Sequence, residues 1–165
     1  MPSRMMTAVN NADSLYLSTE EQRVLVEYAK SLPRRMLAAR QVEQKEGEIA
    51  DLTIAQLQDL YPNFESYHEG GWDRVRLDLT LVLRCLVQAM LMDDPDVAKD
   101  KVLSWLRSMF ESLSFSPQFV ADTYSTLLEA TKQELPEEAF ALLEPYLRDA
   151  LKYLSDFPEP AFVAV

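Results

Sequence analysis

The chain contains very little of the residues on which most enzyme active sites and metal centres depend. Among its 165 residues there is one cysteine, Cys85, and one histidine, His68. A single cysteine excludes an internal disulfide and a cysteine-based metal site, and it favours a reducing compartment. The sequence has no Ser/His/Asp set, no H-E-x-x-H motif and no glycine-rich phosphate loop. We therefore expect a protein without enzymatic activity and without a bound metal ion.

Basic residues and long apolar runs are scarce as well. The 16 lysines and arginines are outnumbered by 27 aspartates and glutamates, which gives a formal net charge of -11. Nucleic acids and anionic membranes bind basic surfaces, so neither is expected as a partner. The longest apolar stretch, residues 77–92, contains Asp78, Arg84 and Gln88 and is too short to span a bilayer. The first residues lack the apolar core of a signal peptide, and we expect a cytoplasmic protein.

What the chain does contain is helical patterning. Hydrophobic residues make up 48% of the sequence, and no stretch shows the alternation of a strand. Ser18-Thr-Glu-Glu21 is a capping box for a helix that extends to Leu32, and Pro33 then indicates a kink or a fresh first turn before helix to about Glu48. We predict further helices at about residues 54–60, 72–92, 94–113, 116–134 and 136–156, with a loop at 61–71 and Pro145 as a candidate bend. The predicted fold class is all-α.

Asp78 is the residue of the predicted 72–92 helix whose position needs a reason. At about 100° per residue it projects roughly 160° away from the centre of the polar stripe, on the apolar face that carries Val82 and Cys85. An ionised carboxylate is not buried without partners. Two alternatives remain open from the residues alone: an ion pair with Arg74, one turn earlier, or hydrogen bonds from a ligand that carries N–H groups.

Three stretches of the chain resemble the phycobilisome proteins, the globin-like family of phycocyanin and allophycocyanin. Residues 11–21, NADSLYLSTEE, are similar to the family's NADxxxRYLSxxE opening, and residues 78–84, DLTLVLR, to the C-x-R-D-(L/I)-x-x-x-L-R start of its central helix. Residues 116–119, SPQF, and the helix opening Pro136-Glu-Glu resemble its last two helices. The resemblance covers about residues 10–156.

The resemblance implies a globin-like helical bundle with an N-terminal helical extension at about residues 7–32. Residues 1–156 are then expected to form a single domain, and residues 157–165, which contain two prolines, a mobile tail. In relatives the extension packs against a second chain, so we expect a homodimer, or a complex with a phycobiliprotein or a bilin-pathway protein, through these helices. The apolar residues that would be costly to leave in water are Leu15, Leu17, Val24 and Leu25.

For Asp78 the resemblance implies a ligand. In the family, the aspartate of C-x-R-D faces a pocket and accepts hydrogen bonds from the pyrrole nitrogens of a linear tetrapyrrole, a bilin. The attachment cysteine of the motif falls on Val75 and its arginine on Leu77, so the family's thioether cannot form here. Cys85 lies ten residues further on, about 15 Å along a helix axis, and cannot replace it. The implied ligand is therefore a non-covalent bilin such as phycocyanobilin or biliverdin.

Other residues near Asp78 are candidate ligand contacts with structural alternatives. Tyr67 and Trp72 could cover a flat ligand or simply the core. His68 is expected at the rim of the pocket rather than on a haem iron, because it lies before the central helix. Phe119 takes the place of a family tryptophan that borders the pigment, although it could equally be a packing residue. Arg74 and Arg76 could pair with propionates of the ligand. The predicted site comprises Asp78, Arg74, Val75, Trp72, Tyr67, His68, Arg76 and Phe119.

The resemblance leaves two functions open. Asp78 on the apolar face favours a non-covalent bilin-binding protein that serves pigment synthesis, delivery or sensing, similar to the bilin biosynthesis-associated globins. The missing cysteine at Val75 and the leucine at Leu77 favour instead a pigment-free interaction protein in phycobilisome assembly or turnover. A solvated face explains Arg76 at least as well as a ligand does.

Overall fold

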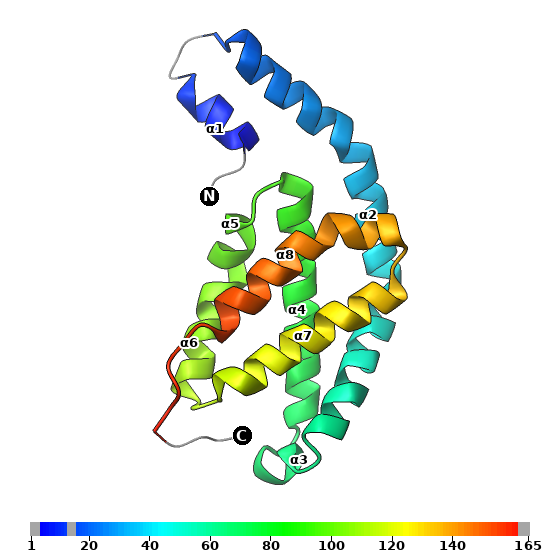
Figure 1. The fold of residues 1–165 in the computed structure, drawn as a ribbon, viewed down its shortest axis with the longest axis vertical. Coiled ribbons are helices and arrows are strands. Elements are labelled where there is room, and N and C mark those ends of the chain that lie inside the picture. Colours follow the sequence, from blue (N-terminus) through cyan, green and yellow to red (C-terminus); the bar gives the residue numbers. More distant parts are fainter. Residues whose placement is uncertain (1–3, 13–15, 162–165) are drawn as a thin grey trace.

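The computed structural model describes residues 4–12 and 16–161, and within them every regular element is a helix (Figure 1). The prediction of an all-α fold is confirmed. The elements are α1 (Arg4–Asn11), α2 (Thr19–Leu60), α3 (Phe64–Tyr67), α4 (Gly71–Met92), α5 (Asp96–Ala98), the π-helical turn η1 (Lys99–Leu103), α6 (Ser104–Ser112), α7 (Pro117–Glu134) and α8 (Glu137–Ser155).

Helix α2 begins at the predicted capping box. The Ser18 backbone N–H donates to Glu21 Oε2 over 2.7 Å, and the Glu21 N–H donates to Ser18 Oγ over 3.3 Å. The predicted break after Glu48 is wrong, because α2 continues to Leu60. Pro33 lies inside this helix, so it does not begin a new one. Thr53, the residue before the separate helix expected at 54–60, is buried and donates its hydroxyl to the Ile49 carbonyl, so it has a partner inside α2.

The later elements follow the predicted order with two differences. The expected loop at residues 61–71 contains the short helix α3, and the expected helix at residues 94–113 changes from α to π geometry at η1. Helix α7 starts at Pro117, where the Ser116 hydroxyl accepts from the Phe119 N–H over 3.0 Å. Phe157, which we assigned to the tail, is 9% exposed and belongs to the core, so the chain stays packed against the bundle through this residue.

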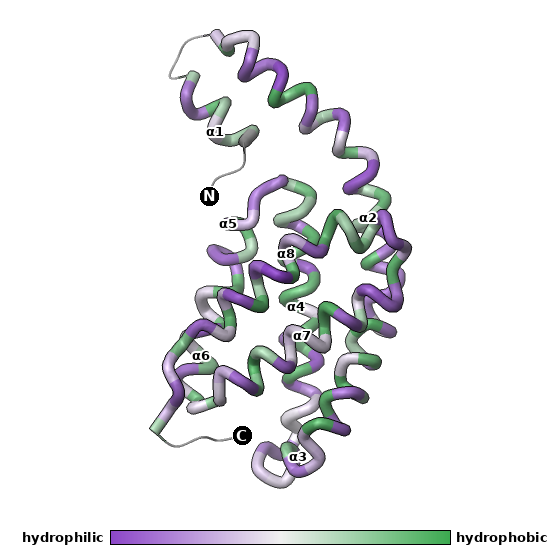
Figure 2. Tube along the Cα trace, viewed as in Figure 1, coloured by the Kyte–Doolittle hydropathy of each residue, from purple (hydrophilic) through white to green (hydrophobic). Residues whose placement is uncertain are grey.

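The core lies between α2, α4, α7 and α8: α2 packs against the other three helices, and α8 also packs against α4 and α7. The largest fully buried side chains come from most of the long helices: Ile49, Leu57, Leu79, Leu83, Leu86, Met90, Leu103, Leu106, Leu127, Leu143, Leu154 and Val82. Hydrophobic and hydrophilic residues are interspersed along the helices (Figure 2). Such mixing is typical of amphipathic helices, which turn an apolar stripe toward the core. Across the described ranges, no helix is both long enough and apolar enough to cross a membrane.

Helix α1 and the N-terminal half of α2 project beyond this bundle as an arm (Figure 1). Helix α1 packs on α2 through Ala8, which is 6% exposed. Leu17, Val24 and Leu25 are half-buried in the arm, and Leu15 lies outside the described residues. The structure thus contains the predicted helical extension, and its first described helix, α1, starts at Arg4 rather than near residue 7.

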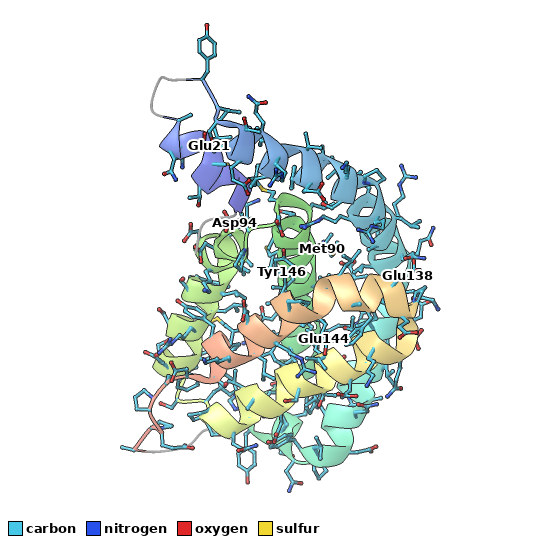
Figure 3. The ribbon with its side chains drawn as sticks, turned by 45° about the horizontal axis from the view of Figure 1, so that its top comes forward. Glu21, Met90, Asp94, Glu138, Glu144 and Tyr146 are labelled. Carbon is cyan, nitrogen blue, oxygen red and sulfur yellow. The ribbon has the colours of Figure 1, made fainter. Side chains whose placement is uncertain are left out.

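A polar junction fixes the arm to the bundle. The Arg35 guanidinium donates to the Met90 carbonyl and, over 2.8 Å, to Asp93 Oδ1, and the Tyr146 hydroxyl donates to the same carboxylate over 3.3 Å. Figure 3 shows Tyr146 beside Met90 at this end of α4. Asp93 ends α4 in the left-handed region with φ 54°, so the junction also holds the C-terminus of the central helix.

Candidate functional site

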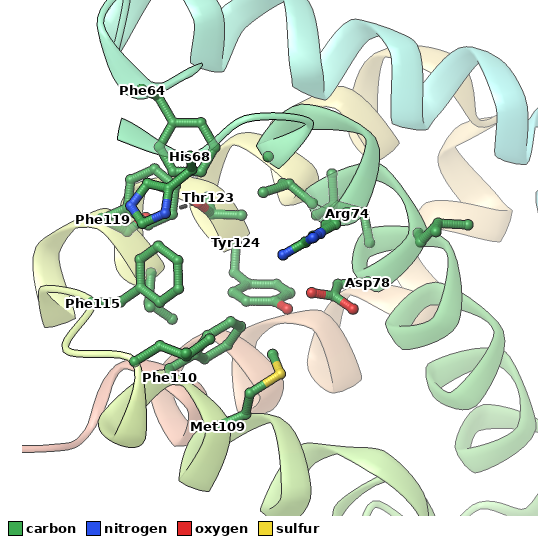
Figure 4. A pocket seen from close by; sticks show the side chains of 16 residues that line it. Phe64, His68, Arg74, Asp78, Met109, Phe110, Phe115, Phe119, Thr123 and Tyr124 are labelled. Atoms are coloured by element: carbon green, nitrogen blue, oxygen red, sulfur yellow. Dashed lines mark hydrogen bonds between the residues drawn. The ribbon is translucent and has the colours of Figure 1, made fainter. Parts of the chain in front are cut away.

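A cavity of about 340 Å³ opens where α3, α4, α6 and α7 meet. Figure 4 shows its labelled side chains, with Asp78 and Arg74 of α4 on one side and a group of aromatic rings on the other. The lining residues are Phe64, His68, Gly71, Arg74, Val75, Leu77, Asp78, Leu79, Met109, Phe110, Leu113, Phe115, Phe119, Val120, Thr123 and Tyr124. The wall is therefore mainly apolar with a few polar groups, as is usual for a small-molecule pocket.

Two adjacent glycines bring the start of α4 against the aromatic wall. Gly70 adopts φ 66°, a backbone conformation that glycine reaches without strain. At Gly71, a Cβ atom would lie 2.6 Å from Phe64 Cε1 and 3.0 Å from His68 Cβ. Only a residue without a side chain therefore allows the first turn of α4 to pack directly on Phe64.

The aromatic wall is a series of stacked rings from three segments. The Phe64 and Phe119 rings are 5.1 Å apart with an interplanar angle of 15°, and Phe115 stacks on Phe119 with centroids 5.4 Å apart. His68 stacks on Phe115 at 5.4 Å, and Phe110 meets the edge of the same ring at 5.9 Å. These rings give the cavity an apolar, aromatic wall.

Asp78 lies in this cavity without a protein partner. Its side chain is half-buried, and no hydrogen bond or ion pair joins it to any described residue. Loss of solvent raises the pKa of the Asp78 carboxyl from its ordinary value of 3.8 to about 6. Arg74 lines the same cavity but makes no ion pair with Asp78, so the first of the two explanations for this carboxylate is not realised.

Tyr124 is the polar residue of the cavity that the sequence did not reveal. Its side chain is 3% exposed, and its hydroxyl is directed toward the Asp78 carboxylate (Figure 4). Burial, together with the negative charge of Asp78, raises the pKa of the Tyr124 hydroxyl, so that it remains protonated. Together with Val120 and Leu127 it has the spacing of a core-facing helix stripe, and that pattern predicts only packing.

Five of the eight predicted site residues line the cavity: Asp78, Arg74, Val75, His68 and Phe119. The lining residues of α6 and of the segment before α7 were not predicted, because only the tertiary fold brings residues 109–115 next to α4.

The other three predicted residues lie elsewhere. Trp72 is buried behind the wall with its ring 4.4 Å from that of Phe64, because the first turn of α4 directs it into the core. Tyr67 is 75% exposed at the end of α3. Arg76 projects toward α2, where its guanidinium donates to Asp51 over 2.8 Å. None of these three residues is among those that line the cavity.

A second hollow, of about 570 Å³, lies between α2 and α4 and is lined by Met36, Ala39, Arg40, Val42, Glu43, Glu46, Arg84, Val87 and Gln88. It is larger but more open, and two of its four charged residues pair with each other. Arg84 forms two hydrogen bonds of 2.7 Å with Glu46, and Lys101 donates to Gln88 from outside the lining. The Asp78 cavity is the better candidate site, because it holds a carboxylate that has no partner in the part of the chain that the structure describes.

A model of the phycobilisome protein family matches residues 7–154. The chain belongs to the phycobilisome protein family. No curated protein matched the sequence. Phycobilisome proteins are pigment proteins that carry bilins, usually through a covalent bond, and they form oligomers. In this family member, Val75 and Leu77 line the cavity at the two positions where the family motif has cysteine and arginine.

Proposed function

We propose that this phycobilisome protein binds a bilin non-covalently and serves in the synthesis, delivery or sensing of that pigment. The observation that carries the proposal is the Asp78 carboxylate, which is half-buried in an apolar cavity and has no partner among the described residues. A carboxylate in such a place loses hydration without compensation unless a ligand supplies donors. The pyrrole N–H groups of a bilin are suitable donors.

The other lining residues fit the same ligand. The stacked rings of Phe64, Phe115 and Phe119 suit one face of a conjugated pyrrole system. Arg74 is exposed at the edge of the cavity, where its guanidinium could pair with a propionate that reaches solvent. Cys85 is not among the residues that line the cavity, so no thiol is available there for attachment. When bound, the bilin would supply visible-light absorption, and the protein would set its protonation and shape.

The size of the cavity bears on how much of the ligand is enclosed. A volume of about 340 Å³ is at the low end of the range for small-molecule pockets. We infer that part of the tetrapyrrole lies inside and that the remainder lies along the mouth, where Leu77 is 68% and Leu113 52% exposed. Two exposed leucines beside one opening are otherwise unfavourable in water.

The alternative function is a pigment-free interaction protein in phycobilisome assembly or turnover. Val75 and Leu77 favour it, because both residues that the family motif uses for attachment and charge are absent. In either case we propose that the protein acts in the cytoplasm, and that the arm of α1 and α2 contacts a second copy, a phycobiliprotein or a bilin-pathway protein.

Co-expression with a bilin-producing pathway, followed by an absorbance spectrum before and after denaturation in acid urea, tests the proposal. We expect colour that purifies with the protein and separates from it on denaturation. Colour that stays attached after denaturation would contradict non-covalent binding. A colourless protein that also fails to bind added biliverdin would favour the interaction protein.

A further inference from the structure

Tyr124 gives the cavity a second polar group that the protein leaves unused. Its side chain is only 3% exposed, yet its hydroxyl has no hydrogen-bond partner among the described residues. Among all residues that the structure describes, every fully buried side-chain nitrogen or oxygen atom has a hydrogen-bond partner. The Tyr124 oxygen must therefore touch the open space of the cavity rather than closely packed protein.

The neighbouring hydroxyl groups, in contrast, have partners within the protein. The hydroxyl of Thr123, one residue earlier in the lining, donates to the Phe119 carbonyl over 2.8 Å. The Tyr61 hydroxyl, on the far side of Phe119, donates to Asp122 Oδ2 over 2.6 Å. Tyr124 and Asp78 lack such partners among the described residues, and the Tyr124 hydroxyl is directed toward the Asp78 carboxylate (Figure 4).

The chemistry of the two groups is complementary. An ionised carboxylate can only accept hydrogen bonds, whereas a phenol that remains protonated can donate one. A ligand that presents an N–H donor to the carboxylate and an oxygen acceptor to the phenol O–H on one edge satisfies both groups. A lactam ring, in which N–H and C=O are on adjacent atoms, has this pattern.

We propose that Tyr124 is a specificity-determining residue that donates its hydroxyl hydrogen to a ligand carbonyl, so that the cavity selects a pyrrole system ending in a lactam. The inference rests on the proposed bilin-binding function and deepens it. In this arrangement the lactam end of the pigment lies at the Asp78–Tyr124 side of the cavity. A pyrrole compound without the carbonyl would leave the buried Tyr124 hydroxyl without a partner, which is the situation that binding sites discriminate against most strongly.

The test uses the full chain, with biliverdin as the main probe and two planar two-ring probes, a dipyrrinone that contains the lactam and a dipyrrin that has an N–H group but no carbonyl. Binding is followed by absorbance and by quenching of tryptophan fluorescence. We expect the dipyrrinone to bind the natural protein about tenfold more tightly than the dipyrrin. Tyr124→Phe, which keeps the ring, should weaken biliverdin and dipyrrinone about fivefold to tenfold and change dipyrrin affinity by less than about twofold.

Tyr61→Phe is the matched control, because it removes a hydroxyl that already has a protein partner next to the same wall. It should leave the ratio of dipyrrinone to dipyrrin affinities unchanged. If biliverdin binds the natural protein and Tyr124→Phe equally well, the lactam contact is absent while the bilin function stands. Equal weakening of both two-ring probes in Tyr124→Phe would show packing rather than a carbonyl contact. If the natural protein binds neither biliverdin nor the dipyrrinone, both proposals fall.

Discussion

Asp78 is a residue that the ligand-free protein keeps at a cost. Its pKa is raised from 3.8 to about 6 because burial removes water without supplying a partner. The folded protein therefore binds the Asp78 proton more tightly than the unfolded chain does. The free energy of unfolding therefore decreases as the pH rises above 3.8, the ordinary pKa of the carboxyl, and this loss is complete above about pH 6.

Asp78→Asn should for this reason stabilise the protein without ligand at pH 7.5. We expect the free energy of unfolding to rise by about 1 kcal/mol, after allowance for the solvent that still reaches the half-buried carboxylate. The gain should shrink as the pH falls through the window from about 6 to 3.8. Urea unfolding of both proteins at several pH values measures it. A variant that is less stable than the natural protein at pH 7.5 would indicate a partner for Asp78 that the structure does not contain.

The same substitution should have the opposite effect on the complex with a bilin. Asparagine keeps the shape of the side chain but removes its negative charge. It also replaces one acceptor oxygen with an NH₂ donor, which would face the N–H donors of the ligand. We expect biliverdin affinity to fall about tenfold or more, or the bound spectrum to shift to the blue and broaden. Titration followed by absorbance tests this, and unchanged affinity and spectrum would remove Asp78 from the binding site.

At the scale of the elements, the start of α4 depends on a glycine. In Gly71→Ala the new Cβ atom would meet Phe64 and His68, so either α4 or the aromatic wall must shift. We expect a loss of about 1–3 kcal/mol in the free energy of unfolding, together with weaker ligand binding. Gly47→Ala is the control, because that glycine is exposed inside α2 with nothing within 4 Å of the added atom.

Gly47→Ala should instead raise the free energy of unfolding by about 0.5–1 kcal/mol, since alanine is the better helix former. Chemical unfolding of the two variants, followed by circular dichroism, compares them directly. If both alanines stabilised the protein, the close contact between Gly71 and Phe64 would not determine the position of α4.

The junction between the arm and the bundle is a second prediction at this scale. Arg35 is held by Asp93 and by the Met90 carbonyl with only 13% of its side chain exposed. Arg35→Met keeps much of the apolar stem but removes the charged donor from both acceptors, which retain only the Tyr146 hydroxyl and the Asp93 N–H. We expect about 1–3 kcal/mol less stability. Arg34→Met is the control at an exposed neighbouring position. Equal stability of the two variants in urea unfolding would show that the junction contributes nothing.

At the scale of the whole molecule, the arm exposes apolar side chains that are unfavourable in a monomer. Val9, Val26 and Leu37 are 47%, 49% and 56% exposed along it, so a protein partner would remove apolar surface from water. We predict that the protein sediments as a dimer at micromolar concentration and that Val26→Glu shifts it to the monomer. Gln58→Glu adds the same charge at the exposed far end of α2 and should leave the dimer intact. A monomeric natural protein at high micromolar concentration, without any partner, would contradict the homodimer.

The arm and the bundle also differ in how far the sequence defines them. The starts of helices could be predicted from the sequence where a capping residue is present, as at Ser18 and at Ser116-Pro117. A capping side chain forms its hydrogen bond with a residue only three positions away, so the signal is local. The continuation of α2 past Thr53 was not readable. A threonine that bonds back to the helix and one that caps a new helix look the same in the sequence, and the burial of Thr53 decides between them.

The sequence by itself determined that the chain is helical and that Asp78 lies on an apolar face, since both follow from spacing along one helix. Only the tertiary structure decided what surrounds that carboxylate. Helix crossings brought the α6 and α7 rings and the Tyr124 hydroxyl to Asp78, while Arg76 paired with Asp51 on α2. These contacts join residues that are 25 or more positions apart, and a helical repeat contains no information about such distances.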